Sequence, residues 1–213
     1  MITLVLASAS SGRLGTLRRA GIDPRVVVSA VDEVAVVAEA EHGRNPLPAR
    51  DVALLLAQAK CRDVFDTLHG AATPDLVLGC DSVLEFDGEV HGKPHSELEA
   101  RRRWQAMRGS SGVLHSGHWL IDRRSDEADR TAQVGGVAST TVHFADLSDA
   151  EIDAYVATGE PMHVAGAFTV DGLGGPYVTR IEGDYHAVVG VSLPLVRTLL
   201  ARFEIDWHEL RPD

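Results

Sequence analysis

The sequence predicts an α/β fold with a long mixed β-sheet flanked by helices. Short, β-branched apolar runs at residues 2–6 and 76–84 alternate with segments of helical periodicity. Residues 113–145 have the pattern of two long antiparallel strands. No linker-like change in composition divides the 213 residues. We therefore expect one domain over residues 1–213, with two lobes around a central cleft as the alternative arrangement.

The N-terminal third is expected to open on a buried strand at residues 2–6. A serine-rich turn and a helix over about 13–20 follow, and Gly21 ends that helix. A second short strand is predicted at 25–29. Residues 35–48 contain a glycine and two prolines, which predict a loop or a broken helix.

In the middle of the chain, apolar residues recur at helical spacing over about 49–68, and Gly70 closes that segment. The strand at 76–84 continues to a hairpin turn at Asp87-Gly88. Ser96 opens another helix, to about residue 107, and Glu99 three residues later completes a capping box.

The C-terminal elements begin with the two long strands, which a charged turn at 125–129 joins. Ser148 and Glu151 form a second capping box, at the start of a helix that ends near Gly159. Residues 164–191 are expected as short strands with glycine-rich turns. A final helix is predicted over 194–203, with proline in its first turn.

The composition narrows the functional class. Hydrophobic residues make up 45% and charged residues 24%, and the formal net charge is −11. This charge argues against a nucleic-acid or anionic-membrane binder, which needs a basic face, but it leaves room for a small anionic substrate. The two cysteines, Cys61 and Cys80, are expected as small buried side chains. The absence of a disulfide framework, a signal peptide and a ~20-residue apolar run predicts a cytoplasmic location.

The turn after the first strand is a candidate anion site. Ser8, Ser10 and Ser11 supply hydroxyl groups, and Gly12 permits a close approach of the backbone. The free N–H groups of the following helix favour an anion, and Arg13 adds a bidentate donor for phosphate. The alternative is a serine-rich turn that only caps the helix.

Asp81 is the strongest candidate for chemistry, because it interrupts an apolar strand directly after Gly79 and Cys80. We interpret it as a carboxylate at a strand end that binds metal or activates water. An edge position facing water or a structural salt bridge are the alternatives.

Three further charged residues stand in distinctive contexts. Lys60 lies in a largely apolar helix, Lys93 lies in a Gly-Lys-Pro corner, and Glu33 ends a short predicted strand. Each taken alone is also compatible with an ordinary solvated surface residue. The histidines show no ligand-like spacing: His115 and His118, three apart in a strand, are expected on opposite faces.

Taken together, these segments resemble the Maf family of nucleotide pyrophosphatases. The segment 6–13 (LASASSGR) resembles the family's opening Leu-Ala-Ser-x-Ser-x-x-Arg. Further matches, in the right order, are Val31-Asp32-Glu33, the helical 56–60 (LAQAK), 79–82 (GCDS), 92–94 (GKP), 155–166 with its Gly-Glu-Pro and Ala-Gly pairs, and 183–195. The resemblance covers nearly the whole chain.

The resemblance implies an elongated mixed α/β fold like that of inosine-triphosphate pyrophosphatases. It implies hydrolysis between the α and β phosphates of non-standard or selected nucleotides, with Mg²⁺, Mn²⁺ or Co²⁺, and a homodimer. By carry-over, Asp81 is the general base, and Glu33 shares the metal with it. Ser8, Ser10, Arg13, Lys60 and Lys93 would hold the triphosphate.

Departures from the family patterns concern the choice of base. Gly12 replaces a large side chain, Ser82 replaces Thr or Gln, and Asp171 replaces Gln or Glu; His163 matches only one subgroup. The first three lie where the family selects the nucleobase. Two other functions stay open at this point: a non-enzymatic nucleotide-binding regulator of cell division and septum formation, and a sugar-nucleotide transferase.

Overall fold

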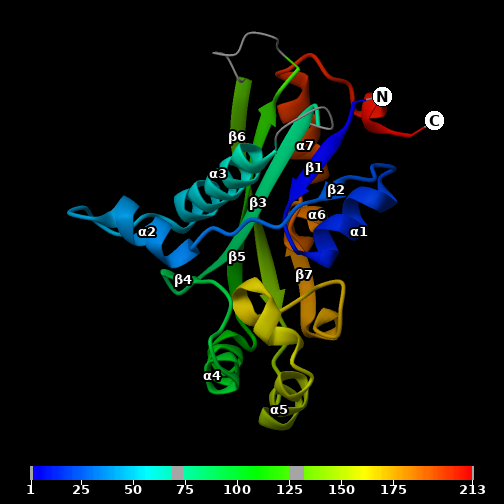
Figure 1. Ribbon diagram of the computed structural model, residues 1–213. Coiled ribbons are helices and arrows are strands. Elements are labelled where there is room, and N and C mark those ends of the chain that lie inside the picture. The colour runs from blue at the N-terminus through cyan, green and yellow to red at the C-terminus, as the bar shows by residue number, and fades with distance from the viewer. Residues whose placement is uncertain (1, 69–73, 125–131, 213) are drawn as a thin grey trace.

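The computed structural model describes residues 2–68, 74–124 and 132–212. Among these residues, seven strands form one mixed sheet, in the order β2-β1-β3-β5-β6-β7 with β4 beside β3 (Figure 1). The pairs β1–β2 and β1–β3 are parallel and the others are antiparallel. This confirms the predicted α/β fold. The strands are β1 (Leu4–Ala7), β2 (Arg25–Val26), β3 (Leu76–Phe86), β4 (Glu89–His91), β5 (Ser111–Asp122), β6 (Ala132–Phe144) and β7 (Val178–Glu182).

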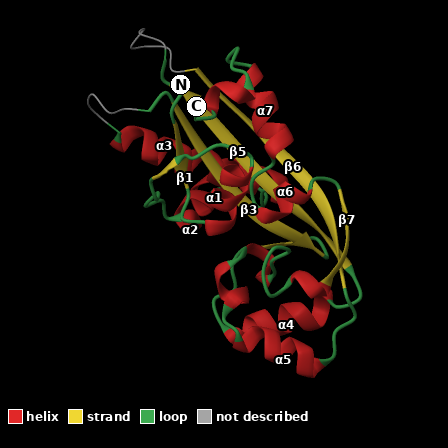
Figure 2. Ribbon diagram, turned by 90° about the vertical axis from the view of Figure 1, so that its right-hand side faces the viewer, coloured by secondary structure: helices red, strands yellow, loops and turns green. Residues whose placement is uncertain are grey.

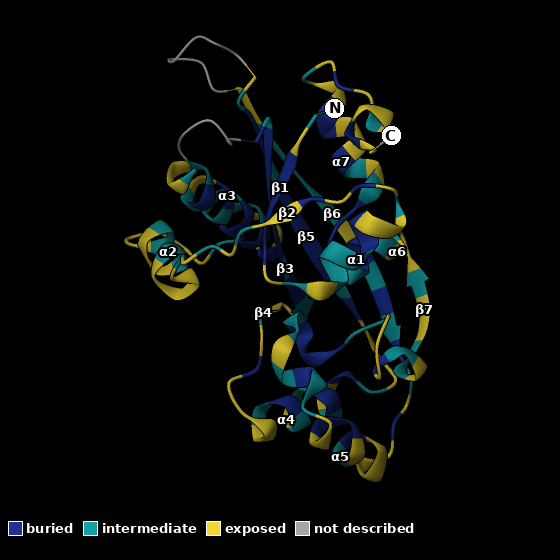
Figure 3. Ribbon diagram, turned by 45° about the vertical axis from the view of Figure 1, so that its right-hand side comes forward, coloured by how far each residue is buried: buried dark blue, intermediate teal, exposed yellow. Residues whose placement is uncertain are grey.

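Helices cover both faces of the sheet and gather at one of its ends (Figure 2). One face carries α3, with the largely exposed α2 beside it (Figure 3), and the other carries α1, α6 and α7. The elongated sheet extends to α4 and α5, which pack on each other at its far end. The helices are α1 (Ser11–Arg19), α2 (Glu33–Glu41), α3 (Ala49–Thr67), α4 (Glu97–Met107), α5 (Asp149–Ala157), α6 (Tyr185–Val189) and α7 (Leu193–Ala201), with 3₁₀ turns η1 (Glu160–His163), η2 (Ala165–Ala167), η3 (Gly175–Tyr177) and η4 (Trp207–Leu210).

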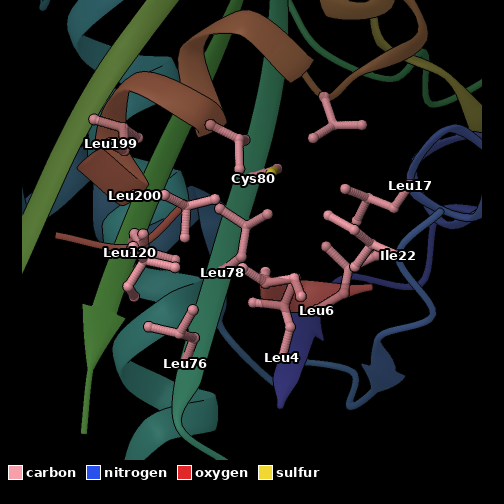
Figure 4. Close-up of a cluster of buried hydrophobic side chains, with 14 residues drawn as sticks. Leu4, Leu6, Leu17, Ile22, Leu76, Leu78, Cys80, Leu120, Leu199 and Leu200 are labelled. Atoms are coloured by element: carbon pink, nitrogen blue, oxygen red, sulfur yellow. The ribbon is translucent and has the colours of Figure 1, made fainter. Parts of the chain in front are cut away.

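The apolar core divides according to these faces. Leucines of β1 and β3 pack against Leu199 and Leu200 of α7 and Leu17 of α1 (Figure 4). At the far end, Trp104 of α4 packs edge-on against Tyr155 of α5, with ring centroids 5.5 Å apart. Both cysteines are buried and free, as predicted.

Several local predictions need correction. The strand expected at 25–29 has only two residues. The segment 35–48, expected as a loop or a broken helix, contains most of α2 followed by a loop, and the helix begins earlier than expected because the Asp32 side chain caps Ala35 N–H. Residues 164–191 form 3₁₀ turns, β7 and α6 instead of several strands. The capping box at α4 is half formed, since Glu99 accepts from His95 N–H rather than from Ser96. The predicted turn at 125–129 and Gly70 lie outside the described residues.

A buried histidine joins the sheet to α7. His118 of β5 is fully buried, and its Nε2 accepts the backbone N–H of Ser192, the N-cap residue of α7, at 2.8 Å. Its proton therefore lies on Nδ1, which donates to Ser116 O at 3.0 Å. Burial, and secondarily the charge of Arg13, lower the pKa of His118 from 6.5 to about 4.

This histidine makes stability depend on pH. Between pH 6.5 and about 4, His118 is protonated in the unfolded chain but stays neutral in the folded protein. The free energy of unfolding should therefore fall with falling pH, by up to about 1.4 kcal/mol per pH unit from this one group. Urea unfolding from pH 7.5 to 4.5 should show a smaller loss for His118→Gln. The same substitution at the exposed His42 should leave the wild-type slope, and equal slopes in both variants would contradict the assignment.

Candidate active site

The candidate site lies at a gap in one edge of the sheet. On that edge, β1 pairs with β3 only up to Gly79, and β4 pairs with β3 only from Leu84 onward. No described strand covers residues 80–83 there. Because β1 runs parallel to β3 and β4 runs antiparallel to it, both end beside the gap. The segments that follow them, 8–12 and 92–95, therefore leave the sheet at this point.

Asp81 lies in this gap, in the interior of β3 rather than at the strand end predicted for it. What ends here is the neighbouring β1. The Asp81 side chain points to the α3 face, where only 9% of it is exposed. The edge position facing water is thereby excluded.

Lys60 of α3 joins Asp81 to Glu33. Its ammonium lies 2.5 Å from Asp81 Oδ1 and 2.7 Å from Glu33 Oε1. Glu33 is the first residue of α2, not the end of a strand, so α2 and α3 together bring the second carboxylate to the gap. Burial raises the pKa of Asp81, and the charges of Lys60 and then Arg13 oppose this rise.

Arg13 fills the opposite face of the same gap. Its Nη1 donates to Ser8 Oγ at 2.9 Å and to Cys80 O at 2.8 Å, and its Nε donates to Gly190 O at 2.9 Å. Its Nη2 donates to Ser82 Oγ at 3.2 Å. The guanidinium thus ties the end of β1 to the uncovered edge of β3 and to the end of α6.

Ser82 belongs to a relay that the sequence did not reveal. Its hydroxyl lies 2.8 Å from the hydroxyl of Ser116, which is fully buried and donates to Ala187 O at 2.7 Å. Because the Ser116 hydroxyl donates its hydrogen to that carbonyl, the Ser82 hydroxyl donates to Ser116 and accepts from Arg13. The Ser82 side chain is therefore held by the sheet and α6.

Ser8 and Ser10 have structural partners. Ser10 is the N-cap residue of α1, and its hydroxyl accepts the Arg13 N–H at 3.3 Å. The buried Ser8 hydroxyl accepts the Ser10 N–H at 3.2 Å. The capping alternative is thus correct for Ser10, while the helix N-terminus still points at the gap.

Gly12 and Asp171 lie next to each other although 159 positions separate them (171 − 12). A Cβ atom on Gly12 would lie 3.6 Å from Asp171 Oδ2 and 3.2 Å from Val189 Cγ1. The Asp171 side chain is exposed. Among the described residues none donates a hydrogen bond to its carboxylate, so it does not cap its own turn.

Lys93 follows β4, which borders the gap at Leu84, and it is exposed. Its corner is fixed from behind, because Gly92 O accepts from Gly166 N–H at 3.1 Å and from Arg103 Nη1 at 2.5 Å. No ion pair within 2–68, 74–124 and 132–212 involves Lys93.

Two side chains at the gap are candidate metal ligands. Within the described chain, no group of three or more His, Cys, Asp or Glu side chains converges on one point. Asp81 and Glu33, however, approach a single ammonium from two sides. Two carboxylates fit Mg²⁺, which commonly takes one or two of them and completes its shell with water and substrate phosphates.

Comparison of the chain with known proteins identifies its family. Residues 3–203 match the family model described as Maf-like protein. The chain belongs to the Maf family.

Maf-family relatives match almost the whole chain. A protein of Leifsonia xyli subsp. xyli is 52% identical over 207 residues, covering 97% of this chain and 95% of the relative. One of Salinispora tropica is 55% identical, covering 96% and 85%, and one of Streptomyces coelicolor is 51% identical, covering 93% and 89%. Each of the three is named nucleoside triphosphate pyrophosphatase.

The residues of the Maf motifs fall into three clusters of contacting side chains. Asp81, Lys60 and Glu33 form one cluster, Arg13, Ser8 and Ser82 form a second, and Gly12 and Asp171 form a third. The first two flank residues 80–83 on opposite faces of β3. Within the described residues, no helix is long and apolar enough to cross a bilayer.

Proposed function

We propose that this protein hydrolyses a nucleoside triphosphate to the monophosphate and pyrophosphate. The observation that carries the proposal is the gap in the sheet edge, where a buried carboxylate and two cationic side chains lie and a third cationic residue follows in the adjoining segment. Asp81 and Lys60 lie on one face, Arg13 lies on the other, and Lys93 follows the strand that borders the gap. The names of the relatives support the same reaction.

In this proposal, the substrate's triphosphate lies across the gap. Asp81 orients a water molecule and takes its proton as the water attacks the α-phosphorus. Arg13, Lys60 and Lys93 stabilise the pyrophosphate as its charge grows. Glu33 and Asp81 would hold a divalent cation, Mg²⁺ with Mn²⁺ and Co²⁺ as alternatives, which would neutralise phosphate charge.

The expected products test the reaction. Chromatography of the mixture at early times should show monophosphate and pyrophosphate in equal amounts, without a second substrate, and EDTA should stop their formation. In isotopically labelled water the label should enter the monophosphate. Orthophosphate as the first product would contradict the proposal. No turnover of any triphosphate would favour the non-enzymatic regulator, and pyrophosphate release only with a second substrate would favour the transferase.

Base selection should lean away from uracil and thymine. Asp171 adjoins Gly12 and has a free, acceptor-only carboxylate, which suits the N–H donors of guanine or cytosine and repels a uracil carbonyl. Values of kcat/KM for GTP, 7-methyl-GTP and CTP should exceed those for UTP and dTTP, and Asp171→Gln should gain on UTP. A wild-type protein about tenfold better on UTP or dTTP would contradict this role of Asp171.

A further inference from the structure

The loop that carries Asp171 is organised by one carboxylate. Glu160, the first residue of η1, accepts four hydrogen bonds from this neighbourhood. The donors are Thr169 Oγ1 at 2.7 Å, Tyr155 Oη at 2.8 Å, and the backbone N–H groups of Leu173 and Gly174, both at 2.9 Å. Two of the donors are main-chain groups on the C-terminal side of Asp171, and one lies two residues before it. The carboxylate therefore clamps the loop on both sides of Asp171.

The loop sequence leaves room for this clamp. A Cβ atom on Gly172 would overlap Glu160 Oε2 and Thr169 Oγ1, and one on Gly174 would overlap Tyr155 Oη. Neither glycine has a positive φ. They are required for the close approach of backbone to carboxylate rather than for a special turn.

The clamp uses neutral donors only. Glu160 forms no ion pair with any residue that the structure describes. Burial alone raises the pKa of Glu160, but the hydrogen bonds from Thr169, Leu173, Tyr155 and Gly174 outweigh it and lower this pKa. The ionised form, with all four acceptor positions available, is the form that fits this loop.

The clamp is anchored in the core. Tyr155 of α5 is 2% exposed and packs edge-on against the fully buried Trp104. Trp104 Nε1 in turn donates to Ala167 O at 2.8 Å, just before the loop. The helices α4 and α5 thus hold Asp171 beside Gly12, through Tyr155 and Glu160.

We propose that Glu160 is a positioning residue for base selection: it holds the 169–174 loop so that Asp171 stands beside Gly12. This rests on the proposed function, because it deepens the role assigned there to Asp171. Glu160 acts through Asp171 and does not touch the substrate. It should consequently affect the choice between bases far more than the handling of phosphates.

Glu160→Gln is the test variant. Oε1 accepts three of the four hydrogen bonds and Oε2 the fourth, so either orientation of the new amide sets its NH₂ against an existing donor. The ratio of kcat/KM for GTP to that for UTP should change by about tenfold or more, as expected for a misplaced contact group. Inhibition by inorganic tripolyphosphate, which carries no base, should remain at the wild-type level.

Two further variants connect the effect to Asp171. In an Asp171→Ala background, Glu160→Gln should leave the GTP-to-UTP ratio unchanged. Glu151→Gln is the matched control, because Glu151 also accepts from a backbone N–H and a hydroxyl, those of Ser148, but caps α5 away from the loop. If Glu160→Gln folds poorly, Thr169→Val removes one donor to the same carboxylate and should shift the ratio in the same direction by less.

The outcomes separate this proposal from the one it rests on. An unchanged ratio in a Glu160→Gln protein that still hydrolyses triphosphates overturns the positioning role alone. An equal fall for all triphosphates together with weaker tripolyphosphate inhibition also overturns it, since that is a general structural effect. A wild-type protein that hydrolyses no triphosphate removes the proposed function and this inference together.

Discussion

Replacement of Asp81 by asparagine should abolish measurable turnover and leave the fold intact. The variant keeps the size and hydrogen-bonding shape of the side chain but loses the negative charge that takes a proton from water. The loss of a general base costs about 10²–10⁴-fold, and the simultaneous loss of a metal ligand adds to this. Steady-state rates with the best triphosphate, at saturating Mg²⁺, measure the effect.

The fold should survive because the substitution leaves no charged side chain without a partner. Lys60 keeps its second partner, Glu33, and the removal of a buried charge also removes its desolvation cost. Asp122→Asn is the matched control: Asp122 is another buried strand carboxylate paired with a cation, Arg124, but it lies at the C-terminal end of β5, beside Leu76 and away from the gap. It should change the thermal midpoint more than the rate. Wild-type activity in Asp81→Asn would exclude Asp81 as base.

The elements that sequence reasoning placed correctly are those with local signals. A C-terminal glycine located the end of α1, periodicity located α3, and the complete capping box located α5. The helix α2 was predicted only as one of two alternatives, a loop or a broken helix, because its apolar residues lie on no single face and none of them is buried. Its N-terminus was detectable only from Asp32, whose carboxylate also fits an acidic pair in a loop.

The site was predicted by residue type but not by geometry. Asp81 was placed at a strand end, because the local pattern cannot show that β1 and β4 stop short of each other on the edge of β3. Ser116 carried no signal, and Glu160 stood out only as part of the Gly-Glu-Pro match with no role assigned to it, since their partners lie up to 71 and 14 residues away along the chain. Such nonlocal hydrogen bonds become visible only once the sheet and the loops have been assembled.

Lys60→Ala should lower kcat/KM by about 2–4 kcal/mol, the range for the loss of one electrostatic donor at a developing charge. Thermal stability should change little by comparison. The carboxylate of Asp81 then loses its nearest cation, but the charge of Arg13 still stabilises its ionised form. A large fall in melting temperature with normal specific activity would instead make Lys60 a structural ion-pair partner.

A second measurement on Lys60→Ala separates its roles. The ammonium now neutralises both carboxylates that would hold the divalent cation. Without it, Asp81 and Glu33 attract a cation more strongly, so the half-saturating Mg²⁺ concentration should fall even as kcat/KM falls.

Lys93→Ala is the matched control, since Lys93 is exposed and pairs with no described carboxylate. This variant should lose a similar amount of kcat/KM with an unchanged requirement for Mg²⁺. If Lys60→Ala needs more Mg²⁺ than the wild type, Lys60 does not compete with the metal for these two carboxylates, and the two-carboxylate site is wrong.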